Sequence, residues 1–313
     1  MNPAEPEPGS VRRSLGQAPL GAATGSPPTL LGPREFLARR SFIELQSRER
    51  AQALLDEGTY RELLGPFDRL ESPWLLMQDV VPQSDDGLVV ARGRLGGKES
   101  VILAIEGKFQ GGGIGEVSGA KIVATLDLAL DDAKNGRPVH VVLLLETGGV
   151  RLQEANLGLE AIAEINSSLV ALRPHVPVVG VIAGMVGCFG GMAITASLCS
   201  YLIMTREARL GLNGPEVIEE QSGIEEFDSK DRRLVWIVTG GEQRHATGFA
   251  DYLTEDDVEA IRRNIIEAFG RGVPATHRSE SVDDYLHRLA TIDVSHQLES
   301  DDVRKLWSEG EHL

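Results

Sequence analysis

Cysteine is scarce in this chain. Only two of its 313 residues are cysteines, Cys188 and Cys199, and they form no CxxC pair. This spacing excludes a four-cysteine zinc ribbon and a disulfide framework. Isolated cysteines fit a reducing cytoplasm, and the N-terminus lacks the continuous apolar segment of a secretory signal. We therefore expect a cytoplasmic protein with no metal site.

Positive charge is also in short supply. There are 31 lysines and arginines against 47 aspartates and glutamates, so the net charge is −16. A negative chain repels phosphate backbones and anionic lipids, which disfavours nucleic acid and membrane-surface partners. The segment Val176–Thr205 has no charge and is long enough to cross a membrane. Pro177 and the glycines between Gly184 and Gly191 interrupt it, so we expect a buried strand, a glycine turn and a buried helix instead.

Side chains suited to catalysis do not cluster in the sequence. The seven histidines are scattered, and no G-x-S-x-G nucleophile motif occurs. Cys188 lies in a glycine-rich segment, where a small buried cysteine is favoured over a nucleophile. Glu116 and Glu154 each follow a glycine turn by about one helical turn. We expect both to support helix N-termini rather than to act as bases.

Three regions of the chain differ in composition. Residues 1–40 are rich in proline and glycine and poor in large apolar side chains, so they cannot bury enough surface to offset the entropy of ordering. We predict a disordered tail there. Residues 41–275 carry the helix and strand patterns of one globular domain. Residues 276–313 predict an acidic, partly helical tail.

The centre of the chain repeats one unit three times: an apolar strand, a glycine turn and a helix. The three strands are predicted at Val101–Ile105, Val141–Glu146 and Val176–Ala183. Each leads through a glycine-rich turn into a helical pattern, which favours an α/β fold. The second and third strands are continuous apolar runs, as expected where helices cover both faces of a sheet.

Further elements flank this core. The segment GLVVARGRLGGKESVILAIEGKF predicts two strands joined by a turn at Gly96-Gly97. A helix is predicted to end near Gly58, a short strand to cover Tyr201–Thr205, and another helix to begin at Pro215. Residues 255–269 predict an amphipathic helix.

The glycine turns admit three interpretations. The first turn, FQGGGIGEVSGAK, has Gly113, Gly115 and Gly119 in G-x-G-x-x-x-G order, one residue too long for a dinucleotide fingerprint. No GK[ST] triple occurs for a phosphate loop, although Glu146 ends the next strand, as a ribose-binding acid would. Alternatively, unpaired backbone N–H groups at helix N-termini bind an oxyanion. In the third interpretation, glycine only permits tight turns and close packing.

Four longer segments resemble a known family. They are FQGGGIGEVSGAKIVATLDLA, ETGGVRLQEANLGLEAIAEI, VPVVGVIAGMVGCFGGMAITASLCSYLIMT and LGLNGPEVIEEQSG. Their order and spacing are similar to the carboxyltransferase β-type domain of the crotonase superfamily. The segments SFIELQSRERAQALLDEG and ELLGPFDRLESPWL resemble one branch of it, the β subunits of biotin-independent malonate decarboxylases. Unlike acetyl-CoA carboxylase β subunits, this chain has too few cysteines for a zinc ribbon.

This resemblance implies a fold and an activity. The fold is a crotonase-like superhelix of repeated ββα units, with the active site at the interface to a γ subunit of similar fold. The substrate is a malonyl thioester on an acyl-carrier subunit, attached through a phosphoribosyl-dephospho-CoA arm, and an acyl-carrier transferase subunit is a further partner. The reaction is decarboxylation through an enolate to the acetyl thioester and CO₂. No cofactor is expected on this chain itself.

The resemblance also assigns site residues. The GG of ETGGVR matches the first oxyanion-binding turn of the superfamily, and the GG of GCFGGM matches the second. The catalytic residues that it implies are Gly148, Gly149, Val150, Gly190 and Gly191. Gly112, Gly113 and Ile114 are expected to line the substrate pocket. Arg151 is assigned to substrate binding, with pairing to a neighbouring carboxylate as its alternative.

Three other functions stay open. A carboxyltransferase subunit would pass the carboxyl group to biotin on a carrier protein, through the same enolate. A non-catalytic scaffold subunit would only organise the carrier protein. A crotonase-type hydratase or isomerase would need Glu116 or Glu154 as its acid and base.

Overall fold

The computed structural model describes residues 37–293, 295 and 300–309. By its contacts the chain divides into Met1–Leu37 and Ala38–Leu313, and the sheet and the helices that cover it belong to the second unit. The predicted disordered tail lies almost entirely outside the described residues, and the domain limits at 41 and 275 stay predictions. None of the described helices is both long enough and apolar enough to cross a membrane.

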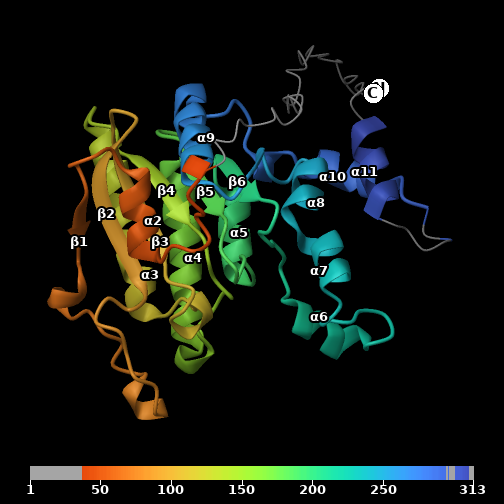
Figure 1. Cartoon of the computed structure of the whole chain (residues 1–313), viewed down its shortest axis with the longest axis horizontal. Coiled ribbons are helices and arrows are strands. Elements are labelled where there is room, and N and C mark those ends of the chain that lie inside the picture. The colour runs from red at the N-terminus through yellow and green to blue at the C-terminus, as the bar shows by residue number, and fades with distance from the viewer. Residues whose placement is uncertain (1–36, 294, 296–299, 310–313) are drawn as a thin grey trace, which may run out of the picture. The chain divides into compact units, whose positions relative to one another are not determined.

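Seven strands form one sheet in which spatial order follows chain order (Figure 1). They are β1 (Arg61–Leu63), β2 (Leu88–Leu95), β3 (Lys98–Ile105), β4 (His140–Leu144), β5 (Val178–Ile182), β6 (Tyr201–Thr205) and β7 (Tyr252–Thr254). β1, β2 and β3 pair antiparallel, whereas β3 to β7 run parallel. The strands predicted in the three repeats and at Tyr201–Thr205 are confirmed as β3, β4, β5 and β6.

The β2–β3 hairpin forms because its two-residue turn suits glycine. Gly96 and Gly97 have φ values of +59° and +80°, in the left-handed region that other residues rarely adopt. Two consecutive positive φ values match the right-handed twist of the strands that they join. The turn predicted at Gly96-Gly97 is therefore confirmed, with Leu95 opposite Lys98.

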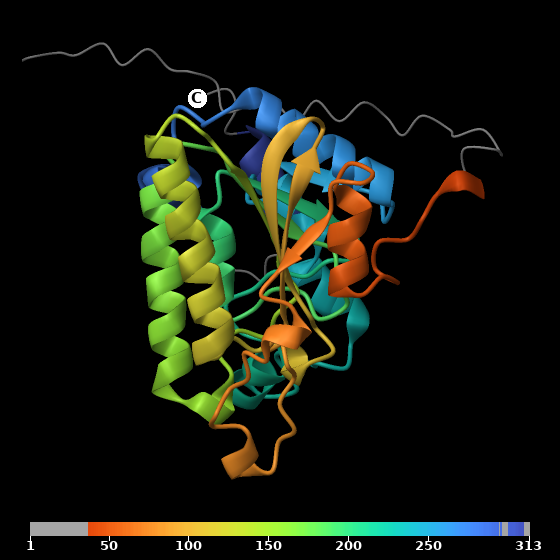
Figure 2. The same cartoon turned by 90° about the vertical axis from the view of Figure 1, so that its left-hand side faces the viewer.

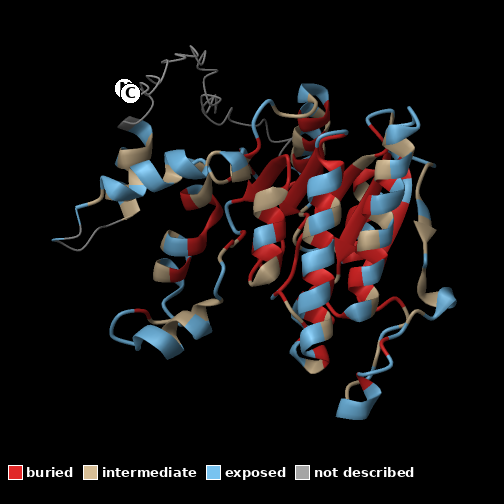
Figure 3. Cartoon of the chain, turned by 180° about the vertical axis from the view of Figure 1, so that it is seen from behind, coloured by how far each residue is buried: buried red, intermediate tan, exposed pale blue. Residues whose placement is uncertain are grey.

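Helices cover both faces of the sheet, as the continuous apolar strands predict. On one face α3 (Glu116–Lys134), α4 (Asn156–Leu172) and α5 (Gly191–Leu198) lie side by side (Figures 1 and 2). On the other face lie α2 (Ser47–Leu54) and α9 (Val258–Arg271). Alternate strand residues serve the two layers, so Val141 and Leu143 pack with α3 and α4, whereas Val142 and Leu144 pack with α2 and α9. In Figure 3 the strands are buried and the outer sides of the helices are exposed.

The remaining described helices lie in the loops or in the C-terminal part of the chain. The α-helices among them are α6 (Pro215–Ser222), α7 (Arg232–Thr239), α8 (Gly241–Ala246), α10 (Val282–Ala290) and α11 (Ser300–Glu309). The 3-10 helices are η1 (Pro66–Asp68), η2 (Leu76–Gln78), η3 (Gln110–Gly112), η4 (Leu152–Glu154) and η5 (Arg278–Glu280). The helices predicted at Pro215 and over residues 255–269 are confirmed as α6 and α9. After residue 276, α11 packs on α8, where Arg304 Nε donates to Gln243 Oε1 at 2.7 Å.

A second, shorter ladder links the repeats. Single parallel bridges join Ile114 to Val150, Thr147 to Cys188, and Cys188 to Leu210. Each repeat therefore contributes one strand to the sheet and one bridging segment to this ladder before its helix begins. This arrangement is the repeated ββα pattern expected from the sequence, and it brings the glycine turns together.

Candidate active site

The three glycine turns follow β3, β4 and β5. Because these strands are parallel, their carboxyl ends meet at one edge of the sheet. Ile114 N–H of the first turn donates to Gly149 O of the second at 2.8 Å. Phe189 N–H of the third turn donates to Thr147 O of the second at 2.9 Å. The structure thus joins the three turns predicted from the sequence into one cluster.

Glycine is required where these turns touch. Gly149 has a φ of +107° and Gly190 a φ of +62°. A Cβ on Gly149 would lie 3.1 Å from Gly190 Cα, and one on Gly112 would lie 1.9 Å from Glu146 O. Close packing therefore accounts for these three glycines, and it fixes the separation of the second and third turns.

Two of the predicted oxyanion donors are occupied within the chain. Gly149 N–H donates to the hydroxyl Oγ1 of Thr147 at 3.0 Å. Gly190 N–H donates to Leu212 O at 2.8 Å. These two glycines shape the turns, and their N–H groups are engaged before any substrate arrives.

The other two predicted donors are unpaired. Within the part of the chain that the structure describes, the N–H groups of Val150 and Gly191 donate to no protein acceptor. Both residues are partly exposed. Gly191 is the first residue of α5, so its N–H group also carries the partial positive charge of a helix N-terminus. The two donors belong to adjacent turns that are in contact.

The residues expected to line the pocket pack against the second turn. Gly112, Gly113 and Ile114 are buried, and each N–H group is bonded to a carbonyl of the chain. Their predicted role as pocket lining stays a prediction.

The helix that follows the first turn is capped by two internal carboxylates. Glu116 N–H donates to Glu154 Oε2 at 2.7 Å, and Ser118 N–H donates to Asp86 Oδ2 at 2.8 Å. Arg151 Nη1 lies between them, 2.7 Å from Asp86 Oδ1 and 2.8 Å from Glu154 Oε1. These carboxylates take the place that a phosphate occupies in a nucleotide-binding turn. The nucleotide interpretation of the first turn is therefore wrong, and Glu154 supports a helix N-terminus as expected.

Arg151 has the second of its two expected roles. Its side chain is 1% exposed, pairs with Asp86 and Glu154, and lies over the Phe109 ring at 5.2 Å. Burial raises the pKa of Asp86, and Arg151 and the Ser118 N–H group partly offset that rise. Because the guanidinium is enclosed and paired, its position does not support direct contact with a substrate.

Glu146 holds the second and third turns against the N-terminal helix. Its carboxylate forms a buried ion pair with Arg50 of α2, and Val186 N–H donates to its Oε1 at 3.3 Å. A Cβ on Gly184 would lie 2.1 Å from its Cδ, and one on Gly107 would lie 2.6 Å from its Cγ. Glu146 is therefore an interior anchor and does not act as a ribose-binding acid.

Both cysteines are buried. Burial raises the pKa of the Cys188 thiol and raises the pKa of Cys199 to about 12. This confirms the small buried cysteine over the nucleophile. In the described residues, no group of three or more His, Cys, Asp or Glu side chains is arranged to hold a metal ion.

An apolar pocket of about 390 Å³ adjoins the third turn. It is lined by side chains from α5, the segment after β6, α8 and the loop that follows: Ala193, Ile194, Ser197, Leu210, Gly211, Leu212, Arg244 and Phe249. The bond from Gly190 N–H to Leu212 O ties its wall to the turn. We refer to it as the Arg244 pocket.

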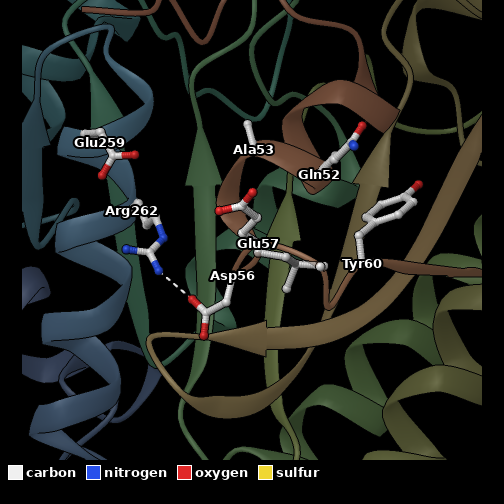
Figure 4. A pocket seen from close by; sticks show the side chains of 9 residues that line it. Gln52, Ala53, Asp56, Glu57, Tyr60, Glu259 and Arg262 are labelled. Carbon is white, nitrogen blue, oxygen red and sulfur yellow. Dashed lines mark hydrogen bonds and ion pairs between the residues drawn. The ribbon is translucent and has the colours of Figure 1, made fainter. Parts of the chain in front are cut away.

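A larger pocket of about 550 Å³ lies between α2 and α9, on the other face of the sheet (Figure 4). Its lining is largely polar, and Arg262 forms an ion pair with Asp56 at 2.5 Å across it. None of its lining residues belongs to a glycine turn. The candidate site is therefore the cluster of turns with the Arg244 pocket.

The sequence did not reveal the roles of three residues near this site. Asp86 and Arg244 lie outside the segments that carry the resemblance. Arg50 lies within SFIELQSRERAQALLDEG, but nothing there points to its partner Glu146, 96 residues away. These roles depend on contacts between residues far apart in the chain, such as the ion pair of Arg50 with Glu146. Local sequence patterns do not indicate such contacts.

Comparisons with known proteins agree with this architecture. The model of the carboxyl transferase domain family matches residues 44–297. A relative from Malonomonas rubra, malonyl-S-ACP:biotin-protein carboxyltransferase, is 39% identical over 285 residues, which cover 87% of this chain and 90% of the relative. A chain of the Pseudomonas malonate decarboxylase hetero-tetramer, solved in complex with malonate, is 57% identical with a TM-score of 0.85. That match covers 88% of this chain and 99% of the other.

More distant relatives are longer. A chain of the transcarboxylase 12S hexamer is 26% identical with a TM-score of 0.59, and the match covers 71% of this chain and 40% of the other. A putative propionyl-CoA carboxylase β chain from Bacillus subtilis is 31% identical, over 88% of this chain and 52% of the relative. This chain thus spans about half the length of such carboxylase chains. These similarities confirm the predicted crotonase-like carboxyltransferase fold.

Proposed function

The chain belongs to the carboxyl transferase domain family, and on that basis we propose that it is a malonate decarboxylase β subunit. Its substrate is a malonyl thioester on an acyl-carrier subunit, and its products are the acetyl thioester and CO₂. The relation to a Pseudomonas malonate decarboxylase chain and to a malonyl-S-ACP carboxyltransferase supports this choice of substrate. The site supports it through backbone donors rather than catalytic side chains.

The chemistry needs stabilisation of one developing charge. When the bond between the malonyl carboxyl carbon and the α-carbon breaks, its electron pair moves onto the α-carbon and the thioester oxygen, and CO₂ leaves. The resulting enolate oxygen accepts hydrogen bonds from Val150 N–H and Gly191 N–H. A proton then adds to the α-carbon. A fixed donor aimed at such an oxygen contributes about 2.7–4 kcal/mol to lowering the barrier.

One observation carries this proposal above the others. Val150 and Gly191 supply two unpaired N–H groups from adjacent turns, while the neighbouring N–H groups of Gly149 and Gly190 are held by internal acceptors. Packing of glycine against glycine fixes the two turns before a substrate binds. Donors that need no rearrangement are the ones that stabilise a transition state most.

We also propose that the chain works in a heteromeric complex whose acyl-carrier subunit carries the substrate on a prosthetic arm. The complex contains a γ subunit of similar fold, the acyl-carrier subunit with its phosphoribosyl-dephospho-CoA arm, and an acyl-carrier transferase subunit. Hetero-tetrameric and hetero-dimeric relatives support a heteromer. Large apolar side chains are exposed around the turns, where a partner would cover them: Leu152 (84%), Met185 (75%) and Leu212 (62%).

One alternative has direct support. The Malonomonas relative is a malonyl-S-ACP:biotin-protein carboxyltransferase, so the carboxyl group could pass to biotin instead of leaving as CO₂. Both reactions use the same enolate. Turnover of a malonyl thioester by the complex in the presence of avidin separates them, because avidin sequesters biotin and leaves a biotin-independent decarboxylation intact.

A hydratase or isomerase is less well supported. Glu154 is buried in its ion pair with Arg151 and caps α3, so it is not free to exchange protons with a substrate. Glu116 accepts a hydrogen bond from Trp74 Nε1 at 2.6 Å.

The remaining alternative is a non-catalytic scaffold subunit. If the chain were one, substitutions in the glycine turns would leave the turnover of the complex unaltered.

Gly191 provides a matched pair of variants. Proline is favoured at the first position of a helix, so Gly191→Pro removes the N–H group while α5 can persist. Gly191→Ala keeps that group and adds the same Cβ, 3.0 Å from Ile162 Cγ2. We expect Gly191→Pro to lower kcat by about 10²–10³-fold, and Gly191→Ala to stay within about threefold of wild type.

The measurement is acetyl thioester formation from a malonyl thioester by the full complex, with size-exclusion chromatography to show that each variant assembles. An assembled Gly191→Pro complex with near-normal turnover would contradict the oxyanion role. Equal losses in both variants would assign the effect to the added Cβ.

A further inference from the structure

Arg244 is a largely buried cation for which the described part of the chain supplies no anionic partner. Its Nε donates to Leu210 O at 2.9 Å, and its guanidinium carbon lies 6.0 Å from the centre of the Phe249 ring. No carboxylate of the described residues forms an ion pair with it. Burial lowers its pKa, and no neighbouring charge offsets that effect.

Most of the described arginines that are not exposed have a carboxylate partner, as Arg50 has Glu146 and Arg151 has Asp86. Arg209 also lacks one among the described residues, but its guanidinium donates to two backbone carbonyls, those of Met185 and Val186. The chain contains 47 acidic and 31 basic residues, so carboxylates are plentiful. A desolvated charge with no counter-ion costs stability. Arg244 is therefore placed for an anion that comes from outside the chain.

The walls of the Arg244 pocket are apolar. Ala193 and Ile194 of α5 form one side, and Leu210 and Leu212 form the other, in a space of about 390 Å³. Methylene groups bind well to such walls, and Arg244 is the only charged residue among those that line the pocket. A ligand that is uncharged along most of its length and anionic at one point fits this composition.

The pocket and the candidate oxyanion site share the helix α5. α5 begins at Gly191, whose N–H group is unpaired, and its next turns carry Ala193, Ile194 and Ser197 along the pocket wall. From Gly191 to Ser197 the helix rises about 9 Å. A thioester whose carbonyl lies at Gly191 can therefore extend its arm along α5 towards Arg244.

We propose that the Arg244 pocket binds the phosphate-bearing arm of the thioester substrate, with the Arg244 guanidinium paired to a phosphate of that arm. The planar guanidinium can donate two parallel N–H bonds to phosphate oxygens. This inference rests on the proposed function, because it takes the substrate to be a thioester at Gly191. It adds a binding residue outside the three glycine turns.

Binding without turnover is the first test. Isothermal titration of the full complex with coenzyme A, which carries phosphates but no acyl group, compares wild type, Arg244→Met and Arg206→Met. Arg206 is the matched control, because it is exposed and pairs with Glu242 at 2.9 Å. We expect Arg244→Met to weaken coenzyme A binding by about 10–100-fold and Arg206→Met to change it less than about twofold. Unchanged affinity in Arg244→Met would overturn the proposal.

Kinetics with two thioesters identifies which anion Arg244 binds. Malonyl-CoA has a phosphate-bearing arm, whereas malonyl-N-acetylcysteamine has none. We expect Arg244→Met to raise KM for malonyl-CoA and to reduce its advantage in kcat/KM over the short thioester by about tenfold or more. Arg244→Lys keeps the charge and should recover part of this advantage.

Equal losses on both thioesters would overturn the proposal, because they would place Arg244 on the malonyl carboxylate. The proposed function is tested separately. A wild-type complex that binds coenzyme A through Arg244 but does not decarboxylate the malonyl thioester on its acyl-carrier subunit would contradict the decarboxylase assignment and leave the pocket assignment standing.

Discussion

The first glycine turn leads into α3 and the third leads into α5, and the two helix N-termini are completed in different ways. At α3 the carboxylates of Asp86 and Glu154 accept the first N–H groups, and Arg151 neutralises them. At α5, among the residues that the structure describes, the first N–H group, that of Gly191, has no acceptor and the nearby Arg244 has no carboxylate partner. The charges at the first turn are balanced by partners within the chain, whereas at the third turn we propose that an external anion supplies the missing partner.

This difference shows what a glycine pattern determines and what it does not. In both turns glycine permits positive φ and close contact with the next segment, as at Gly112 and Gly190. Whether the following helix is free to bind an anion depends on carboxylates supplied by other segments. Asp86, which caps α3, comes from the loop before β2.

The largest predicted effect is loss of Arg151, which would break the closed turn. Arg151→Met leaves Asp86 and Glu154 buried without a cation, and we expect a loss of about 3–5 kcal/mol in the free energy of unfolding. The loss should be greatest near neutral pH. Burial already holds the folded-state pKa of Asp86 above its ordinary value. Stability that depends on its protonated form is therefore present at low pH and lost as pH rises through that pKa.

Urea denaturation of the full chain at several pH values measures this effect. Arg206→Met is the control, since an exposed ion pair contributes only about 0–1 kcal/mol. If Arg151→Met were as stable as the control at neutral pH, the first turn would not depend on its internal charges.

The next prediction concerns how accessible the third turn is to solvent. Cys188 belongs to this turn, yet it is fully buried and its pKa is raised by burial. We expect a thiol reagent to label the native protein at least about 100-fold more slowly than the urea-denatured protein, because labelling requires local opening. The difference should persist at pH 9. Fast labelling of Cys188 in the native chain would contradict this, because it would mean that solvent reaches the interior of the turn as well as its unpaired N–H group.

The smallest predicted effect concerns the stability of the Arg244 pocket. Replacing Arg244 by an apolar side chain removes a desolvation cost but also removes the hydrogen bond to Leu210 O. Because the two effects oppose each other, Arg244→Met should change the free energy of unfolding by less than about 1 kcal/mol, in either direction. Thermal denaturation of the ligand-free protein checks this. A loss comparable to that of Arg151→Met would show that Arg244 is a structural residue of the same kind.

The strands of the fold were predictable because their environment marks the sequence. β4 and β5 are covered on both faces, so nearly every residue in them is apolar. Helix limits were less predictable. The sequence predicts that the first helix ends near Gly58, but it ends at Leu54. Asp56 N–H donates to Arg94 O of β2 at 2.6 Å instead of to a helical carbonyl, so the helix cannot continue.

The candidate site was predictable only in its local part. The turns at Gly149 and Gly191 have sequence signals, since glycine pairs before helices are recognisable. The ion pairs that hold them are not local, because Arg50 lies 96 residues from Glu146 and Asp86 lies 65 residues from Arg151. Which N–H groups stay unpaired depends on such distant partners, so the sequence could propose the donors but could not select among them.

The edges of the sheet set a limit on how this chain assembles. β1 and β7 are the two edge strands, and each has three residues. An edge strand exposes unpaired backbone groups to which another chain can add a strand, either as a specific partner or in aggregation. Strands this short offer few such bonds. Addition of a strand from another chain is therefore disfavoured at both ends of the sheet.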